Sequence, residues 1–155
     1  MGYTHYAELH PIDQAAADVA FADLRSDLER LLWWAGSPSL GIKLGDAHGA
    51  EWPELSADLI AFNGYGSESF ESFYWPRPVT ACDQPGLPYA GWFCKTGRRP
   101  YDPVVVAALV LAQYHYGPAV KLSSDGTDEE LRPGFDLLRS CWPLRLLPGP
   151  EVFNG

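Results

Sequence analysis

The sequence has few cysteines, few basic residues and no long apolar run, and each scarcity argues against a class of protein. The three cysteines among 155 residues, Cys82, Cys94 and Cys141, form no Cys-x-x-Cys pair, which argues against a disulfide framework or a structural zinc site. The longest apolar run, 103–112, has about half the residues that a membrane-spanning helix requires. With 11 Lys and Arg against 20 Asp and Glu, the net charge of −9 argues against a protein that coats nucleic-acid phosphates.

The composition that is present is that of a packed globule. Hydrophobic residues make up 46% of the chain and aromatic residues 14%. A chain of this length buries a sizeable core without a metal or a disulfide, so we expect residues 1–155 to form one domain, ending in a Pro- and Gly-rich tail at 143–155. The N-terminal residues 1–5 lack the basic and apolar regions of a signal peptide, which predicts a soluble, cytoplasmic protein.

The charge is unevenly distributed along the chain. Residues 1–80 hold 12 acidic and 4 basic residues, whereas residues 81–155 hold 8 and 7. Within the second half, Lys95, Arg98 and Arg99 fall inside five residues and form the densest basic cluster. A basic cluster in an acidic protein indicates a local binding site.

Hydrophobic periodicity and capping residues predict helices. Apolar residues at three- and four-residue steps predict a helix over 13–36, with Asp13 as its N-cap and Gly36 just past its end. A second helix is predicted with Asp102 as N-cap, proline at the first helical position and Gly117 past the end.

A third helix is predicted to begin at a capping box formed by Thr127 and Glu130, and to be interrupted at Pro133 and Gly134. Residues 37–57 lack a clear period and are predicted to be a long connection, and the Pro-rich segment 76–90 a loop. Period-two patterns predict strands at 59–62, 70–75, 92–95 and 119–123, the first two forming a hairpin.

These elements predict an α+β fold. We expect a single domain with a small mixed sheet of about four strands and two or three helices packed on it. The order strand, helix, strand over 92–123 favours a right-handed crossover. Such a crossover brings the segment 123–126 to the same sheet edge as the segment 95–101.

The segment 93–102 carries the strongest functional signal. It places three cations, a hydroxyl and a phenol between a strand and a helix N-terminus, where exposed amides and the helix dipole favour anions. The pattern lacks both the P-loop and the spaced glycines of a dinucleotide site. The expected ligand-binding residues are Asn63, Lys95, Thr96, Arg98, Arg99, Tyr101, Ser123, Ser124 and Asp125.

No residue is assigned a catalytic role, although three acid, base or nucleophile arrangements are conceivable. Asp102 is explained by capping rather than catalysis, and Cys94 is better explained as a buried strand cysteine than as a thiolate with His115 as its base. Glu68 and Glu71 with Asp125 could serve as general acid and base. The four histidines do not fall at metal-ligand spacing, so neither a metal nor a cofactor is expected.

Three short motifs resemble those of a known group of proteins. Phe62-Asn63-Gly64, the run Phe-Cys-Lys-Thr-x-Arg-x-Pro-Tyr-Asp at 93–102, and Ser-Ser-Asp-Gly at 123–126 are similar to motifs of small uncharacterised proteins of tailed bacteriophages and prophages. The resemblance covers about residues 60–126 and implies a phage accessory protein in the host bacterial cytoplasm. Phe70 stands where that group tends to have histidine, which argues against chemistry that depends on that histidine.

Three classes of function follow. The first is an anti-defence protein that binds and sequesters a small anionic, nucleotide-like ligand at the basic segment. The second is an acidic inhibitor of a host defence or nucleic-acid enzyme, acting through the Asp-rich face of the 13–36 helix. The third is a small hydrolase or transferase acting on a phosphorylated substrate, and a homodimer through exposed aromatic residues stays open in each class.

Overall fold

The computed structural model describes residues 2–79 and 90–154 and confirms the α+β single domain. The strands are β1 (Thr4–Leu9), β2 (Leu44–Gly45), β3 (Glu54–Leu55), β4 (Leu59–Gly64), β5 (Phe73–Pro76), β6 (Ala90–Lys95) and β7 (Val120–Ser124). The α-helices are α1 (Gln14–Ala35), α2 (Asp102–Tyr116) and α3 (Asp128–Cys141), and short 3₁₀ turns are η1 (Gly66–Glu68), η2 (Gly117–Ala119) and η3 (Pro150–Phe153).

The strands form two small antiparallel sheets. In the first, β1 lies between β6 and β7 and pairs with both, and in the second, β4 pairs with β2, β3 and β5. The expected mixed sheet is therefore wrong, because β1, which the sequence pattern did not reveal, is inserted between β6 and β7. The two crossover strands still run in the same direction, but they are neighbours of β1 rather than of each other.

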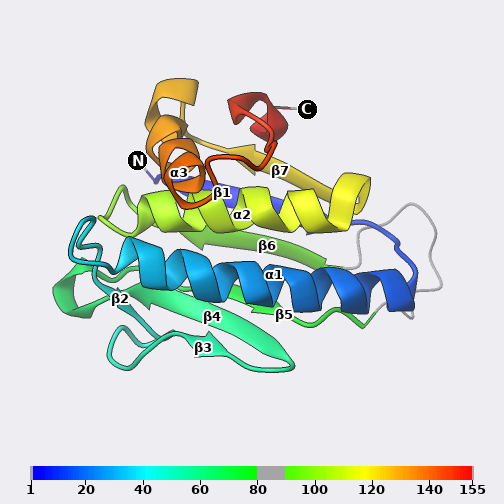
Figure 1. The fold of residues 1–155 in the computed structure, drawn as a ribbon, viewed down its shortest axis with the longest axis horizontal. Coiled ribbons are helices and arrows are strands. Elements are labelled where there is room, and N and C mark those ends of the chain that lie inside the picture. The colour runs from blue at the N-terminus through cyan, green and yellow to red at the C-terminus, as the bar shows by residue number, and fades with distance from the viewer. Residues whose placement is uncertain (1, 80–89, 155) are drawn as a thin grey trace.

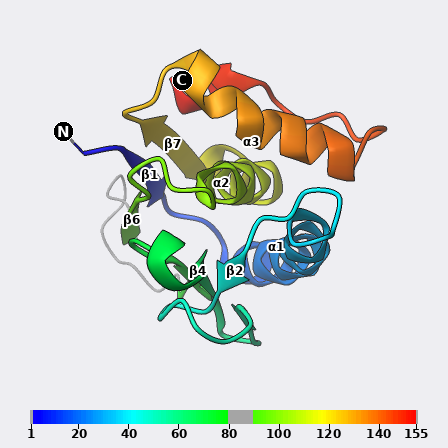
Figure 2. The same cartoon turned by 90° about the vertical axis from the view of Figure 1, so that its left-hand side faces the viewer.

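Helix α2 forms the centre of the domain. Residues Val104–Ala112 are all buried, so this helix is surrounded on every side. Figures 1 and 2 show the strands along one side of α2, with α1 and α3 packed on its other sides. An apolar helix of this kind, without a polar face, is stable only when neighbours cover its whole circumference.

The helix boundaries follow most of the expected signals. Asp13 caps α1 by accepting a hydrogen bond from the amide of Ala16, and Gly117 ends α2 with a φ of 65°. The capping box of Thr127 and Glu130 is confirmed. The expected interruption at Pro133 is wrong, because α3 runs continuously through this exposed proline.

The N-cap assignment of Asp102 is also wrong. Asp102 is the first residue of α2, Tyr101 is the N-cap, and no side chain caps this helix end. The carboxylate of Asp102 instead turns towards His5 and Thr96, which is the basis of the site described below.

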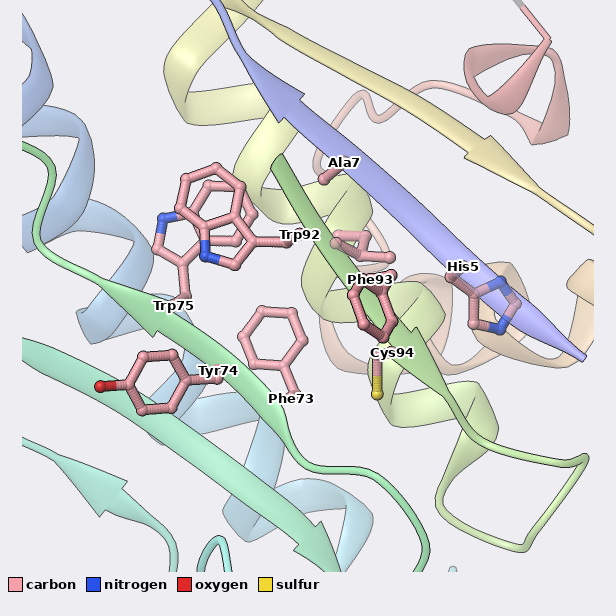
Figure 3. Close-up of a pocket in the computed structure, with 9 residues that line it drawn as sticks. His5, Ala7, Phe73, Tyr74, Trp75, Trp92, Phe93 and Cys94 are labelled. Atoms are coloured by element: carbon pink, nitrogen blue, oxygen red, sulfur yellow. The ribbon is translucent and has the colours of Figure 1, made fainter. Parts of the chain in front are cut away.

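Aromatic side chains join the two sheets. Figure 3 shows Trp75 of β5 lying against Trp92 of β6 across the gap between the sheets, with ring centroids 4.2 Å apart and planes 13° from parallel. Phe62, Phe73 and Trp75 continue this stack through the core. A cavity of about 10 Å³ remains beside the stack, enough for about one water molecule.

Several expected loops contain structure. The connection 37–57 includes β2 and β3, and the tail 143–155 includes η3, whose Phe153 is buried against Phe135. Cys82 and most of the expected loop 76–90 lie outside the described residues. Within the described ranges, no helix combines the length and apolar character needed to cross a bilayer.

Candidate functional site

The three motif segments meet at one end of the domain, the end that faces the viewer in Figure 2. In the sheet register, Thr4 at the start of β1 lies opposite Lys95 at the end of β6, and His5 lies opposite Ser124 at the end of β7. The loop between β6 and α2 and the segment 123–126 therefore share one edge, as the sequence predicted.

Three of the expected ligand-binding residues are buried and bond internally. Asn63, Thr96 and Tyr101 are 2%, 0% and 0% exposed. The Asn63 amide donates to the carbonyl of Phe70 and accepts from its backbone amide, and the Tyr101 hydroxyl donates to the carbonyl of Glu71. These side chains support the site from beneath, and their expected role as direct ligand contacts stays a prediction.

The three cations of the loop separate into two groups. The Lys95 ammonium and the Arg99 guanidinium lie 5.8 and 5.5 Å from the ring centroid of Phe70, which is 43% exposed. Arg98 turns the other way, 4.3 Å from the ring centroid of Tyr3 and 2.6 Å from a carboxylate oxygen of Glu130. Among the described residues, no carboxylate forms an ion pair with Lys95 or Arg99.

The backbone of this loop is strained at Arg98. Its φ is 59°, in the left-handed region, and the preceding Gly97 has a φ of 58°. Such a conformation in a long side chain costs of order 1 kcal/mol and persists only where surrounding contacts hold it. The ion pair with Glu130 and the contact with Tyr3 supply those contacts and point Arg98 away from Lys95.

His5 is a candidate functional residue that the sequence analysis missed. Its Nε2 lies 2.6 Å from Oδ1 of Asp102, and its Nδ1 lies 2.7 Å from Oγ of Ser124. The Thr96 hydroxyl donates to the same Asp102 oxygen over 2.5 Å. His5 is 1% exposed and Asp102 7%, so this chain of hydrogen bonds lies in a largely dry environment.

The hydrogen-bond partners of His5 determine its neutral tautomer. An ionised carboxylate only accepts hydrogen bonds, so Asp102 requires the proton of a neutral imidazole to be on Nε2. The lone pair of Nδ1 then accepts the hydroxyl proton of Ser124. In this arrangement the imidazole can take a proton from Ser124 while Asp102 stabilises the resulting positive charge.

Two further polar groups lie against this cluster. The Tyr3 hydroxyl is buried and, within the described part of the chain, has no hydrogen-bond partner. Burial, then the nearby carboxylates of Asp102 and Glu130, raise the pKa of Tyr3, so its hydroxyl stays protonated and can donate. Asp125 accepts from the amide of Thr4 over 3.1 Å, whereas Ser123 is exposed.

Cys94 is a buried strand cysteine, as expected. It is 5% exposed, and burial, together with the charges of Glu71 and Asp102, raises the pKa of its thiol to about 12. Its thiol donates to the carbonyl of Glu71. His115 pairs with Asp27 rather than with Cys94. The alternative in which His115 serves as the base for a Cys94 thiolate is therefore wrong.

The acidic face of α1 is partly neutralised. Asp27 accepts from His115 over 2.6 Å and from Arg145, and Asp18 accepts from Arg77 over 2.8 Å. This pairing neutralises two of the acidic residues of α1 and weakens the basis for an acidic inhibitor.

The fold and the site define a small α+β protein with two neighbouring features. One is the basic aromatic surface of Phe70, Lys95 and Arg99, and the other is the hydrogen-bonded group of His5, Asp102 and Ser124. Comparison with protein families, curated proteins and solved structures finds no match for this chain. Within residues 2–79 and 90–154, no group of three or more His, Cys, Asp or Glu side chains is arranged to hold a metal ion.

Proposed function

We propose that the protein binds and sequesters a small anionic, nucleotide-like ligand at the surface formed by Phe70, Lys95 and Arg99. The observation that carries this proposal is the placement of two cations, neither paired with a described carboxylate, around one half-exposed aromatic ring. An aromatic face stacks on a base with little preference for sequence, and adjacent cations bind phosphate.

The rigidity of the surface supports this function. Asn63 holds the backbone of Phe70 through both its carbonyl and its amide, and the Arg99 guanidinium donates to the carbonyl of Ser67 over 3.1 Å. A surface that is ordered before the ligand arrives avoids part of the entropy cost of binding. The resemblance of the three motifs to phage proteins supports a phage accessory setting, and we propose that the protein acts there against host defence, in the host cytoplasm.

The test is a thermal-shift titration with mono-, di- and cyclic nucleotides and inorganic phosphate. A ligand at 100 times its Kd adds about 2.7 kcal/mol to the free energy of unfolding, which is a rise in Tm of roughly 5–10 °C for a chain of this size. Lys95→Ala, Arg99→Ala and Phe70→Ala should each reduce the rise without unfolding the protein. Added salt should also reduce it, because screening weakens phosphate contacts.

The matched control is Lys121→Ala, which removes an exposed cation from β7. This variant should respond to the ligand as the unmodified protein does. A panel without any shift, or a Lys95→Ala and Arg99→Ala double variant that still responds in full, would refute the proposal.

The anti-defence role needs a separate experiment. Native mass spectrometry of protein purified from bacteria with active nucleotide-based immunity should reveal a retained small molecule. The same preparation of the double variant should lack it, and an unliganded mass for both proteins would count against sequestration.

A further inference from the structure

The cluster around His5 carries a chemistry that the anion surface does not need. We propose that Ser124 is a nucleophile with His5 as its general base, in a site that hydrolyses a carboxylic ester. Asp102 is the positioning residue of this group, because it contacts the imidazole and not the reacting atoms.

The Ser124 oxygen has the hydrogen bonds that a nucleophile requires. Its hydroxyl proton points to Nδ1 of His5 over 2.7 Å, and the amide of Gly126 donates to the oxygen over 2.9 Å. A hydroxyl oxygen has two lone pairs, so one lone pair remains for attack. Ser124 is partly exposed at the end of β7, an outer strand of its sheet, which gives a substrate access.

Two aromatic rings contact the imidazole of His5. The ring of Tyr3 meets it edge-on at 5.0 Å between centroids, and the ring of Phe153 lies at 6.2 Å. Asp102 is itself fixed, because Thr96 donates to it and because it opens helix α2, where the helix dipole favours a carboxylate. A base held in this way needs little reorganisation during proton transfer.

A donor for developing negative charge is also present. The hydroxyl of Tyr3 lacks a partner within the described residues, and it lies 2.7 Å from the position that a Cβ would take on Gly126. The Tyr3 ring therefore packs directly against the backbone that follows Ser124, and no side chain fits at position 126.

The reaction proceeds in two balanced steps. Ser124 Oγ forms a bond to the ester carbonyl carbon while its proton moves to His5 Nδ1, and the alkoxide leaves with that proton as an alcohol. Water then attacks the acyl-serine, again giving its proton to His5, which returns it to Ser124 Oγ as the carboxylic acid is released. Water is the only co-reactant.

This site is independent of the anion surface, because its nucleophile, base and positioning residue are different side chains. The probe is therefore a neutral fluorophosphonate. Ser124 Oγ forms a bond to phosphorus as fluoride leaves, and the Ser124 hydroxyl proton moves to Nδ1 of His5. Intact mass and peptide mapping should find one adduct, on Ser124.

Substitutions separate activation from simple exposure. Ser124→Ala should abolish the adduct, whereas Ser123→Ala, the adjacent and more exposed serine, should leave it unchanged. His5→Gln should slow labelling about 100-fold or more, the usual contribution of a general base. Thermal melting of each variant establishes that it is folded.

The positioning role of Asp102 is tested by ¹⁵N NMR of the His5 imidazole. The ¹⁵N spectrum of the ring should show His5 protonated on Nε2, and Asp102→Asn should shift these ring signals and slow labelling. Absence of an adduct in the folded protein, equal labelling of Ser123, or a ring protonated on Nδ1 at neutral pH would each overturn the proposal. Lys95→Ala should not affect labelling, so failure of the anion surface and failure of this site are distinguishable.

Discussion

Replacement of Gly134 by alanine should destabilise the protein, although helix propensity alone predicts the opposite. Gly134 lies inside α3, where glycine costs about 1 kcal/mol relative to alanine. A Cβ at this position would lie 2.4 Å from Cγ1 and 2.6 Å from Cβ of Val106 on α2. These distances are about 1 Å shorter than a normal carbon–carbon contact of about 3.5 Å.

The overlap cannot be relieved at low cost. Val106 is fully buried, and a valine in a helix is almost restricted to one side-chain rotamer. Overpacking of this kind costs about 3 kcal/mol, so after the gain in helix propensity the net loss is about 2 kcal/mol. For a domain of this size we expect Tm to fall by roughly 4–8 °C, measured by calorimetry or circular dichroism.

Two further variants test whether packing is the cause. Gly91→Ala makes the same change where a Cβ meets nothing within 4 Å, and should leave Tm nearly unchanged or slightly raised. In a Val106→Ala background the Cγ1 methyl at 2.4 Å is removed while Cβ at 2.6 Å stays, so Gly134→Ala should become less harmful, with a coupling of at least about 1 kcal/mol. An unchanged or higher Tm for Gly134→Ala would refute the close approach of α2 and α3.

Further substitutions test the stability of the tail and of the anion surface. Asp27→Asn should lower the free energy of unfolding at pH 7 by about 2 kcal/mol in urea denaturation, because His115 and Arg145 lose a partly buried carboxylate partner. The control is Asp23→Asn at an exposed position, which should lower the free energy of unfolding by under about 0.5 kcal/mol. Burial alone would raise the pKa of Asp27, but its hydrogen bonds to His115 and Arg145 hold that pKa below the ordinary 3.8. The difference in unfolding free energy between the unmodified protein and Asp27→Asn should therefore be complete above pH 3.8 and vanish as the pH falls through the lowered folded-state pKa. A difference in unfolding free energy that persists in acid would contradict this. Asn63→Ala should cost about 2–4 kcal/mol and weaken anion binding, because it leaves the backbone amide and carbonyl of Phe70 unpaired; unaltered chemical denaturation would argue against that role.

Much of the fold was predictable because its signals are local. The cap at Asp13, the glycine at 117 and the capping box at Thr127 act within one helical turn, and the hairpin of β4 and β5 joins strands that are close in sequence. The proline in α3 misled because its local cost is offset by packing along the buried face of the helix.

The candidate site was predictable in its location but not in its chemistry. The loop 95–101 and the segment 123–126 do meet at one sheet edge, as the strand–helix–strand order indicated. Which cations face the surface and which are paired depends on the left-handed turn at Arg98 and on Glu130, 32 residues further along the chain. The alternation over Tyr3, His5 and Ala7 was the signal that could have revealed β1 and its inward-facing histidine.

The sequence by itself determined the α+β class, most of the helix ends, the hairpin and the basic segment, because caps, turns and periodicity act over a few residues. The tertiary structure decided that β1 lies in the centre of its sheet and that His5 joins Asp102 and Ser124. Those partners are 97 and 119 residues away in the chain, and no local pattern encodes a hydrogen bond over that separation. Only the packing of β1, α2 and β7 around one core brings the three side chains together.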